Sequence, residues 1–182
     1  MSPAATALTR SWIVLALCTG CASTLPGSEG DDTGEDGAWF EIGWGDESFS
    51  PLVDGDAFPV VWGGQGAAMF PMPIRGGGFV LPDDPRNYLD ERAPIMDLHV
   101  DIEGFNTGIG GYFKRIANYP VVFEILDDGT YEFIYVAIIL PDDVDPFALE
   151  GLPARLWVQL RPYGREPLVS ELDLTVTVID NR

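Results

Sequence analysis

The sequence predicts an all-β protein without a substantial helix. Apolar residues recur at every second position in several segments, and turn-forming sequences separate these segments. Glycine and proline are abundant, with 21 and 15 of the 182 residues. Seven to nine short strands with this spacing are typical of a single antiparallel β-sandwich of the immunoglobulin or fibronectin kind. A closed barrel is the alternative arrangement of such strands.

The first predicted strands are short and contain prolines. Residues 39–42 form the first strand and residues 58–62 the second. Pro59 indicates an edge or the start of a strand, because proline has no N–H group to donate. Residues 67–75 are strand-like, although two prolines interrupt them.

The clearest strand covers residues 95–103. Its apolar residues alternate strictly with polar ones, among them Asp97, His99 and Asp101. This alternation indicates one buried face and one face in contact with water. Residues 112–116 form the next short strand.

An Asp-Asp-Gly-Thr sequence at residues 127–130 predicts a hairpin turn. The turn would connect strands at residues 121–126 and 131–140. The second of these strands is apolar on both faces from Phe133 to Leu140, which is typical of a central strand.

Two further alternating strands, at residues 155–161 and 172–179, complete the domain. Residues 143–150 form at most one helical turn. Residues 76–94 show no strand pattern, and long loops of this kind are often functional. If the domain has a binding surface, we expect it there and in residues 104–111.

Residues 1–20 have the order of a secretory signal peptide: Arg10 supplies a positive charge, and a short apolar run and small residues follow. The apolar run is too short to span a bilayer, which takes about 20 residues. Thr19-Gly20-Cys21 resembles the lipobox of bacterial lipoproteins, with Cys18 where leucine is usual. The resemblance implies that the sulfur of Cys21 carries a lipid. Cleavage after Ala22, which would release a soluble secreted protein, is the alternative.

Residues 21–37 are predicted to be a lipidated cysteine followed by a flexible acidic tether. They contain five acidic residues and almost no apolar ones, so they cannot bury enough surface to fold. The β domain then occupies residues 38–182. These segments predict an exported protein anchored in a membrane. Ala22 after the cysteine favours the outer membrane, by resemblance to the sorting rule of enteric bacteria.

The formal charge of −19 argues against nucleic acid as a partner, because an acidic surface repels phosphates. The chain has only two cysteines, Cys18 and Cys21, so the β domain has no disulfide and no thiol chemistry. It contains one lysine, Lys114, and one histidine, His99. We therefore expect a protein that is not an enzyme and needs no cofactor.

Trp157 is the centre of a predicted ligand surface. It lies on the outward side of its strand beside side chains that form hydrogen bonds, an arrangement with which a β-sheet can hold a sugar ring. The surface consists of Arg155, Trp157, Gln159 and Arg161.

Acidic residues in two loops are candidate ligands for Ca²⁺, which prefers oxygen atoms. Their spacing does not match an EF-hand. The main group is Asp142, Asp143, Asp145 and Glu150, and a second group is Asp83, Asp84 and Asp90. The set of Asp97, His99 and Asp101 is instead interpreted as a solvated face, since side chains on one straight strand diverge.

The start of the domain resembles an uncharacterised family of secreted or lipid-anchored proteins from myxobacteria and their relatives. The family shares the pattern G-x-G … F-x-P-L-x-D-G-D … G-P-Q-G-G. The chain matches it at Gly43-Trp44-Gly45, at residues 49–56 (FSPLVDGD) and at residues 63–66 (GGQG). Gly64 stands in place of the proline, and Ala67 in place of a glycine. The resemblance implies export and a β fold, and it implies no activity.

Together these features predict a lipid-anchored interaction or structural module of the cell envelope. Its partners would be the membrane, through the lipid, and an envelope protein or a glycan. A carbohydrate- or calcium-binding accessory domain is the alternative, and a hydrolase is the third hypothesis.

Overall fold

The computed structural model of the protein describes residues 37–45 and 48–180. The predicted signal peptide, Cys21 and nearly all of the predicted tether lie outside these residues, so what the sequence indicates for them stays a prediction. In the part of the chain that is described, no helix is long and apolar enough to cross a membrane.

The described chain is all-β, as predicted. Its only helical elements are two 3₁₀ turns, η1 (Ile109–Gly111) and η2 (Pro146–Leu149). The additional strand is β2 (Ser50–Pro51), and β7 (Glu124–Ile125) covers only part of the strand expected at residues 121–126. The ten strands are β1 (Trp39–Trp44), β2 (Ser50–Pro51), β3 (Ala57–Trp62), β4 (Ala68–Gly77), β5 (Ile95–Ile102), β6 (Lys114–Pro120), β7 (Glu124–Ile125), β8 (Tyr131–Ile139), β9 (Pro153–Arg161) and β10 (Leu168–Val178).

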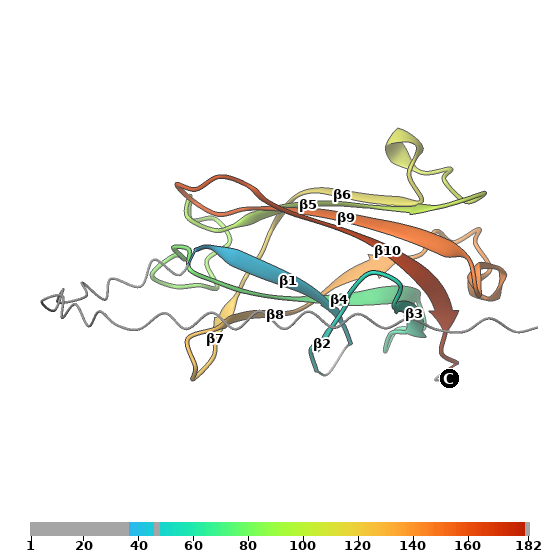
Figure 1. Ribbon diagram of the computed structural model, residues 1–182, viewed down its shortest axis with the longest axis horizontal. Coiled ribbons are helices and arrows are strands. Elements are labelled where there is room, and N and C mark those ends of the chain that lie inside the picture. Colours follow the sequence, from blue (N-terminus) through green and yellow to red (C-terminus); the bar gives the residue numbers. More distant parts are fainter. Residues whose placement is uncertain (1–36, 46–47, 181–182) are drawn as a thin grey trace, which may run out of the picture. The chain divides into compact units, whose positions relative to one another are not determined.

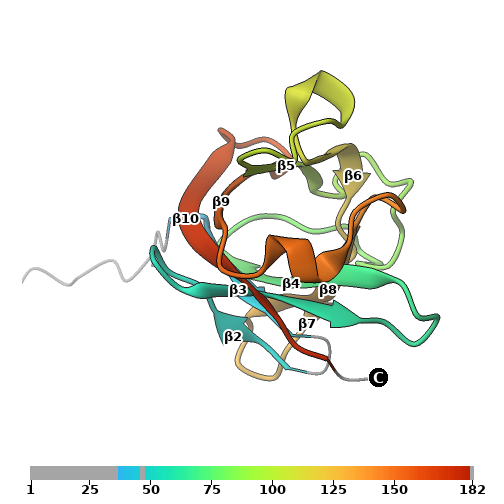
Figure 2. The same cartoon turned by 90° about the vertical axis from the view of Figure 1, so that its right-hand side faces the viewer.

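All ten strands belong to one curled sheet (Figures 1 and 2). The strand order is β2-β1-β4-β3-β10-β9-β5-β6, and β8 lies on the other side of β4 with β7 beside it. The curl places β5, β6 and β9 across from β4 and β8, as in half of a barrel (Figure 2).

Strand β3 joins the two halves of the sheet. It pairs with β4 at Val61 and Trp62, and it pairs with β10 along Ala57–Val60. The β3–β10 pair is parallel, with Phe58 beside Val176. The prediction of a purely antiparallel sandwich is therefore wrong at this pair, because the alternation within a strand does not show which strand lies beside it.

The prolines of β3 and β4 lie at positions where the N–H side of the residue faces no paired neighbouring strand. One edge of β4 is shared by β3, which pairs at residues 68–69, and by β1, which pairs at residues 74–77. Pro71 and Pro73 fall in the gap between them. Pro59 belongs to the part of β3 that pairs only with β10, so one side of β3 is an edge there, as predicted.

The core lies between the two halves of the curled sheet. Every second residue of β5 and β9 is buried, which confirms the predicted alternation. Phe58 and Phe70 are fully buried, and their rings stack with centroids 4.1 Å apart. No charged or polar residue of the described chain is buried, so apolar packing holds the core together.

Strand β8 is an edge strand over most of its length. It pairs with β4 on one side, while on the other side β7 reaches only Tyr131 and Glu132. The predicted central position is therefore wrong for the rest of the strand. Its inward side chains lie in the core, but Ile134 and Ile139 on its outer side are 62% and 45% exposed.

Candidate functional site

The outer face of β5, β6 and β9 carries the candidate site. His99 of β5 lies directly opposite Trp157 of β9 and opposite Arg115 of β6. Its chain neighbours Leu98 and Val100 are buried. Because successive side chains of a strand point to opposite faces, His99 is directed outward with Trp157.

Three rings form a continuous stack on this face. The imidazole of His99 lies 4.1 Å from the Tyr112 ring and 4.9 Å from the Trp157 ring, measured between centroids. The planes are inclined by 27° and 13°. Tyr112 directly follows η1, and Gly110 within η1 has a φ of 78°. A Cβ atom at Gly110 would lie 3.1 Å from the tyrosine ring, so a glycine leaves room for the stack.

The stack changes the acidity of His99. Burial disfavours the charged imidazolium and lowers the pKa of His99 below 6.5, and the positive charge of Arg115 acts in the same direction. The carboxylate of Asp101, 4.0 Å from Nε2, opposes this shift but does not overcome it. His99 is therefore neutral at neutral pH, and its contact with Asp101 is not an ion pair there.

A β-bulge fixes one end of this face. Ala117 and Asn118 of β6 lie opposite the single residue Asp97 of β5. Asn118 has a φ of 53°, which is the left-handed region. Its N–H donates to Asp97 Oδ1 at 2.8 Å, and Arg161 Nη2 donates to both Asp97 Oδ2 and Asn118 Oδ1, at 2.8 and 2.9 Å.

The stack and the bulge border a groove of about 560 Å³. Two side chains that line it have unused hydrogen-bonding groups: in the described part of the chain, neither the Arg115 guanidinium nor the Gln159 carboxamide has a hydrogen bond or ion pair. Asp97, His99, Tyr112, Asn118 and Trp157 also line it. The groove therefore offers ring edges, one free cation and amide groups to a ligand.

The predicted ligand surface is divided by the structure. Trp157 and Gln159 line the groove, and Arg161 supports its bulge. Arg155 instead pairs with Asp173 at 3.0 Å and Glu171 at 3.5 Å, and these partners raise its pKa. It borders a separate acidic hollow of about 450 Å³ at the other end of the strands.

Asp97 and His99 line the groove although the sequence analysis interpreted them as a solvated face, and three further groove residues were missed by the sequence reasoning: Tyr112, Arg115 and Asn118. All three belong to β6 or to the turn before it. β5 and β6 are consecutive strands, and consecutive strands commonly pair, which would have brought residues 112–118 beside His99. The bulge that aims Asn118 has no signal in the sequence.

The predicted calcium ligands after β8 have structural roles or stand apart. Asp145 accepts the N–H of Phe147 and caps η2, and Glu150 accepts the N–H of Val178 at 2.6 Å. Asp142 and Asp143 are exposed. Within residues 37–45 and 48–180, no group of three or more His, Cys, Asp or Glu side chains is placed to hold a metal ion.

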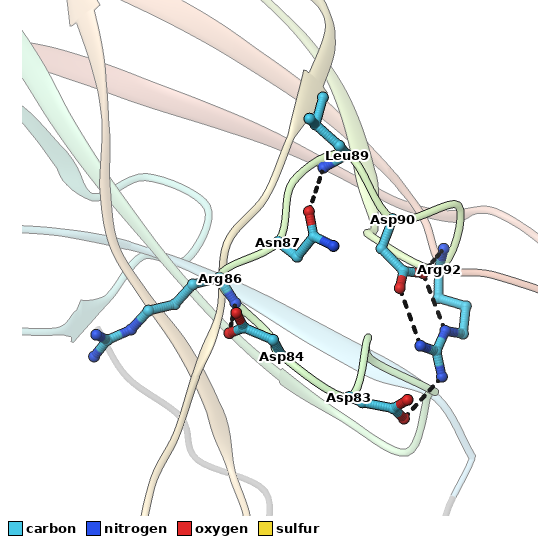
Figure 3. A network of polar contacts seen from close by, with 7 residues as sticks. All are labelled: Asp83, Asp84, Arg86, Asn87, Leu89, Asp90 and Arg92. Atoms are coloured by element: carbon cyan, nitrogen blue, oxygen red, sulfur yellow. Dashed lines mark hydrogen bonds and ion pairs between the residues drawn. The ribbon is translucent and has the colours of Figure 1, made fainter.

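The second acidic group is organised by an arginine, as Figure 3 shows. Arg92 contacts Asp83 at 3.0 Å and Asp90 at 3.0 Å, and its hydrogen bonds lower the pKa of both carboxyl groups. Asp84 accepts the N–H of Arg86 instead. The acids of this loop therefore fix the loop's own conformation.

Comparison with protein-family models, with curated proteins and with solved structures finds no match to this chain. The resemblance to the secreted lipoprotein family therefore stays an expectation from the sequence.

Proposed function

We propose that this chain is an interaction module of the cell envelope that is displayed from a membrane through a lipid on Cys21. The groove on the outer face of β5, β6 and β9 is its ligand surface. One observation carries the proposal: the Tyr112–His99–Trp157 stack lies beside Arg115 and Gln159, whose side chains have no hydrogen bond or ion pair in the described part of the chain.

A binding role suits this groove better than catalysis. Rings cover both faces of His99, and Asp97 is engaged by two hydrogen-bonding partners. Neither group is placed as a free general acid or base. The rings and the amide groups can bind a ligand without reacting with it.

The candidate ligands of the groove are an envelope protein and, second, a carbohydrate. Sugars have apolar C–H faces and hydroxyl groups, and aromatic rings beside amide and guanidinium groups recognise both features. The free Arg115 would favour a sugar that carries a carboxylate. The calcium alternative has no comparable arrangement among the described residues.

A glycan array that includes uronic acids tests the groove, with the full chain as the probe. Carbohydrate binding predicts signals that Trp157→Ala and Gln159→Ala weaken and that Tyr163→Ala leaves unchanged. Tyr163 is a matched control, because it is 46% exposed and follows β9 outside the groove. A blank array, or signals that do not depend on Trp157, would leave an envelope protein as the groove's ligand.

Metabolic labelling with a clickable palmitate tests the anchor. The wild type should take up the label, and Cys21→Ser should not. If the wild type stays unlabelled, the anchor is refuted while the groove remains to be tested.

A further inference from the structure

The open edge of β8 presents hydrogen-bonding groups of the main chain that no strand uses. Leu140 donates its N–H to Ala68 of β4. Since these groups alternate along a strand, those of Ala137 and Ile139 point away from β4. Among the described residues, β7 is the only strand on that side, and its pairing with β8 covers only Tyr131 and Glu132. The edge is therefore free to pair with a further strand.

Most of the usual protections of an edge strand are missing here. Edges are commonly blunted by lysine, proline or inward charges. Residues 133–140 of this chain contain no charged residue and no proline. The outer side chains Ile134 and Ile139 are exposed. A bulge opposite Pro73 shifts the register near Ile134 but leaves the remaining edge extended.

A hollow lies at each end of the open edge. The first, of about 310 Å³, lies where the chain at Val122 separates from β8, and Phe133 and Ile134 line it. The second, of about 230 Å³, is lined by Ile139 and Val144 among others. Five residues of extended chain, about 17 Å, separate Ile134 from Ile139. One added strand could therefore place side chains in both hollows.

Charge distinguishes between the occupants of this edge. Asp142 and Asp143 follow the edge directly, are exposed and have no ion pair in the described part of the chain. A second copy would bring its own acidic residues to the edge, and each domain carries a net charge near −15. Two such copies repel each other. A strand with basic residues at the end that reaches Asp142 is complementary.

We infer that β8 binds an extended segment of another protein, added antiparallel to its open edge, with aliphatic side chains in the two hollows and a basic N-terminal end at Asp142 and Asp143. Main-chain hydrogen bonds would supply the affinity and the hollows the selectivity, as in other strand-addition complexes. This surface is separate from the groove beside His99, so either can fail without the other.

A synthetic peptide of nine residues, the length of β8, tests the inference. It consists of two lysines followed by alternating isoleucine or valine and threonine, and it is titrated into the full ¹⁵N-labelled chain. We expect a Kd of about 100 μM and shifts of the Ala137 and Ile139 amide signals. Hydrogen exchange of these two amides should slow when the peptide binds.

Backbone methylation separates strand addition from contact through side chains alone. Two versions of the peptide carry N-methyl groups at alternate residues, in opposite phases. The phase that blocks the hydrogen bonds to β8 should bind about tenfold more weakly, and the other phase should bind like the parent. Equal binding of both versions would overturn the inference.

Two protein variants and one peptide variant complete the test. Ile139→Lys should weaken binding, whereas Val169→Lys, at a residue 54% exposed on β10, should not. Glutamate in place of the two lysines should also weaken it. No binding of the parent peptide overturns the inference. So does a dimer of the wild type that Ile139→Lys dissociates, because a second copy would then occupy the edge.

Discussion

Phe58→Leu should reduce the free energy of unfolding measurably while preserving the fold. Phe58 is fully buried on β3, the strand shared by both halves of the sheet, and it stacks on Phe70 of β4 with an interplanar angle of 12°. Leucine keeps the site apolar and nearly fills it. The fold should therefore survive, whereas alanine could consume much of the stability of a domain.

The size of the effect follows from two contributions. Loss of the aromatic pair costs about 0.5–1.5 kcal/mol beyond the buried area. Imperfect filling of the ring's space adds about 0.5 kcal/mol. We expect a total of about 1–2 kcal/mol. Phe70→Leu should cost more, because Phe70 also meets Phe113 edge to face at 6.4 Å.

Urea unfolding followed by tryptophan fluorescence measures these differences. The double variant Phe58→Leu/Phe70→Leu should be less destabilised than the sum of the single variants, by about 0.5–1.5 kcal/mol. Tyr163→Leu, on an exposed turn, is the control and should stay within about 0.5 kcal/mol of the wild type. A Phe58→Leu variant as stable as the wild type, or strict additivity, would refute the reasoning.

Three other changes test the site and the N-terminal strands. The folded-state pKa of His99 lies below 6.5, so the folded protein favours the neutral imidazole. This contribution to the free energy of unfolding is fully present above pH 6.5 and is lost as the pH falls toward the lower folded-state pKa. Urea unfolding at about pH 7.5 and pH 5.5 should therefore show a larger loss of unfolding free energy in the wild type than in His99→Gln, and equal losses in the two proteins would contradict this prediction. Asn118→Ala should cost about 1–2 kcal/mol in thermal unfolding, because it removes the hydrogen bond to Arg161 and leaves a β-carbon in the left-handed region, while Asn118→Gly should cost less. Gly43→Ala should reduce the free energy of unfolding by about 1–3 kcal/mol, since the new Cβ would lie 2.7 Å from both Phe49 Cε2 and Ser50 O. The control is Gly64→Ala, whose Cβ would meet no atom within 4 Å, so this variant should have the same melting temperature as the wild type.

The sequence predicts strands well and their neighbours poorly. The alternation of residues 95–103 and 155–161 indicates both strands and their buried faces, because one face meets the core and the other meets water. The pairing of β3 with β10 has no such signal, since it depends on how the whole sheet curls. The misplacement of β8 has the same origin: an apolar outer face looks the same whether another strand covers it or it lies at an exposed edge.

The candidate site was predictable only along single strands. Trp157 and Gln159 follow from the parity of β9, and His99 follows from the parity of β5. Their association depends on the register between β5 and β9. The position of Tyr112 depends on a turn of positive-φ glycines, and that of Asn118 on a bulge. Features of this kind arise from tertiary packing and cannot be inferred from local sequence.

The parallel pair of β3 and β10 also governs when the domain can fold. At the start of this pairing, Asp173 donates its N–H to Asp54, 119 residues earlier in the chain. Contacts this distant in sequence make folding slow, on the order of milliseconds to seconds for β domains. The two halves cannot be joined until β10 is available to β3. If the chain is exported as we propose, and enters the export channel before β10 is synthesised, it would remain unfolded during transport and fold only after β10 is released.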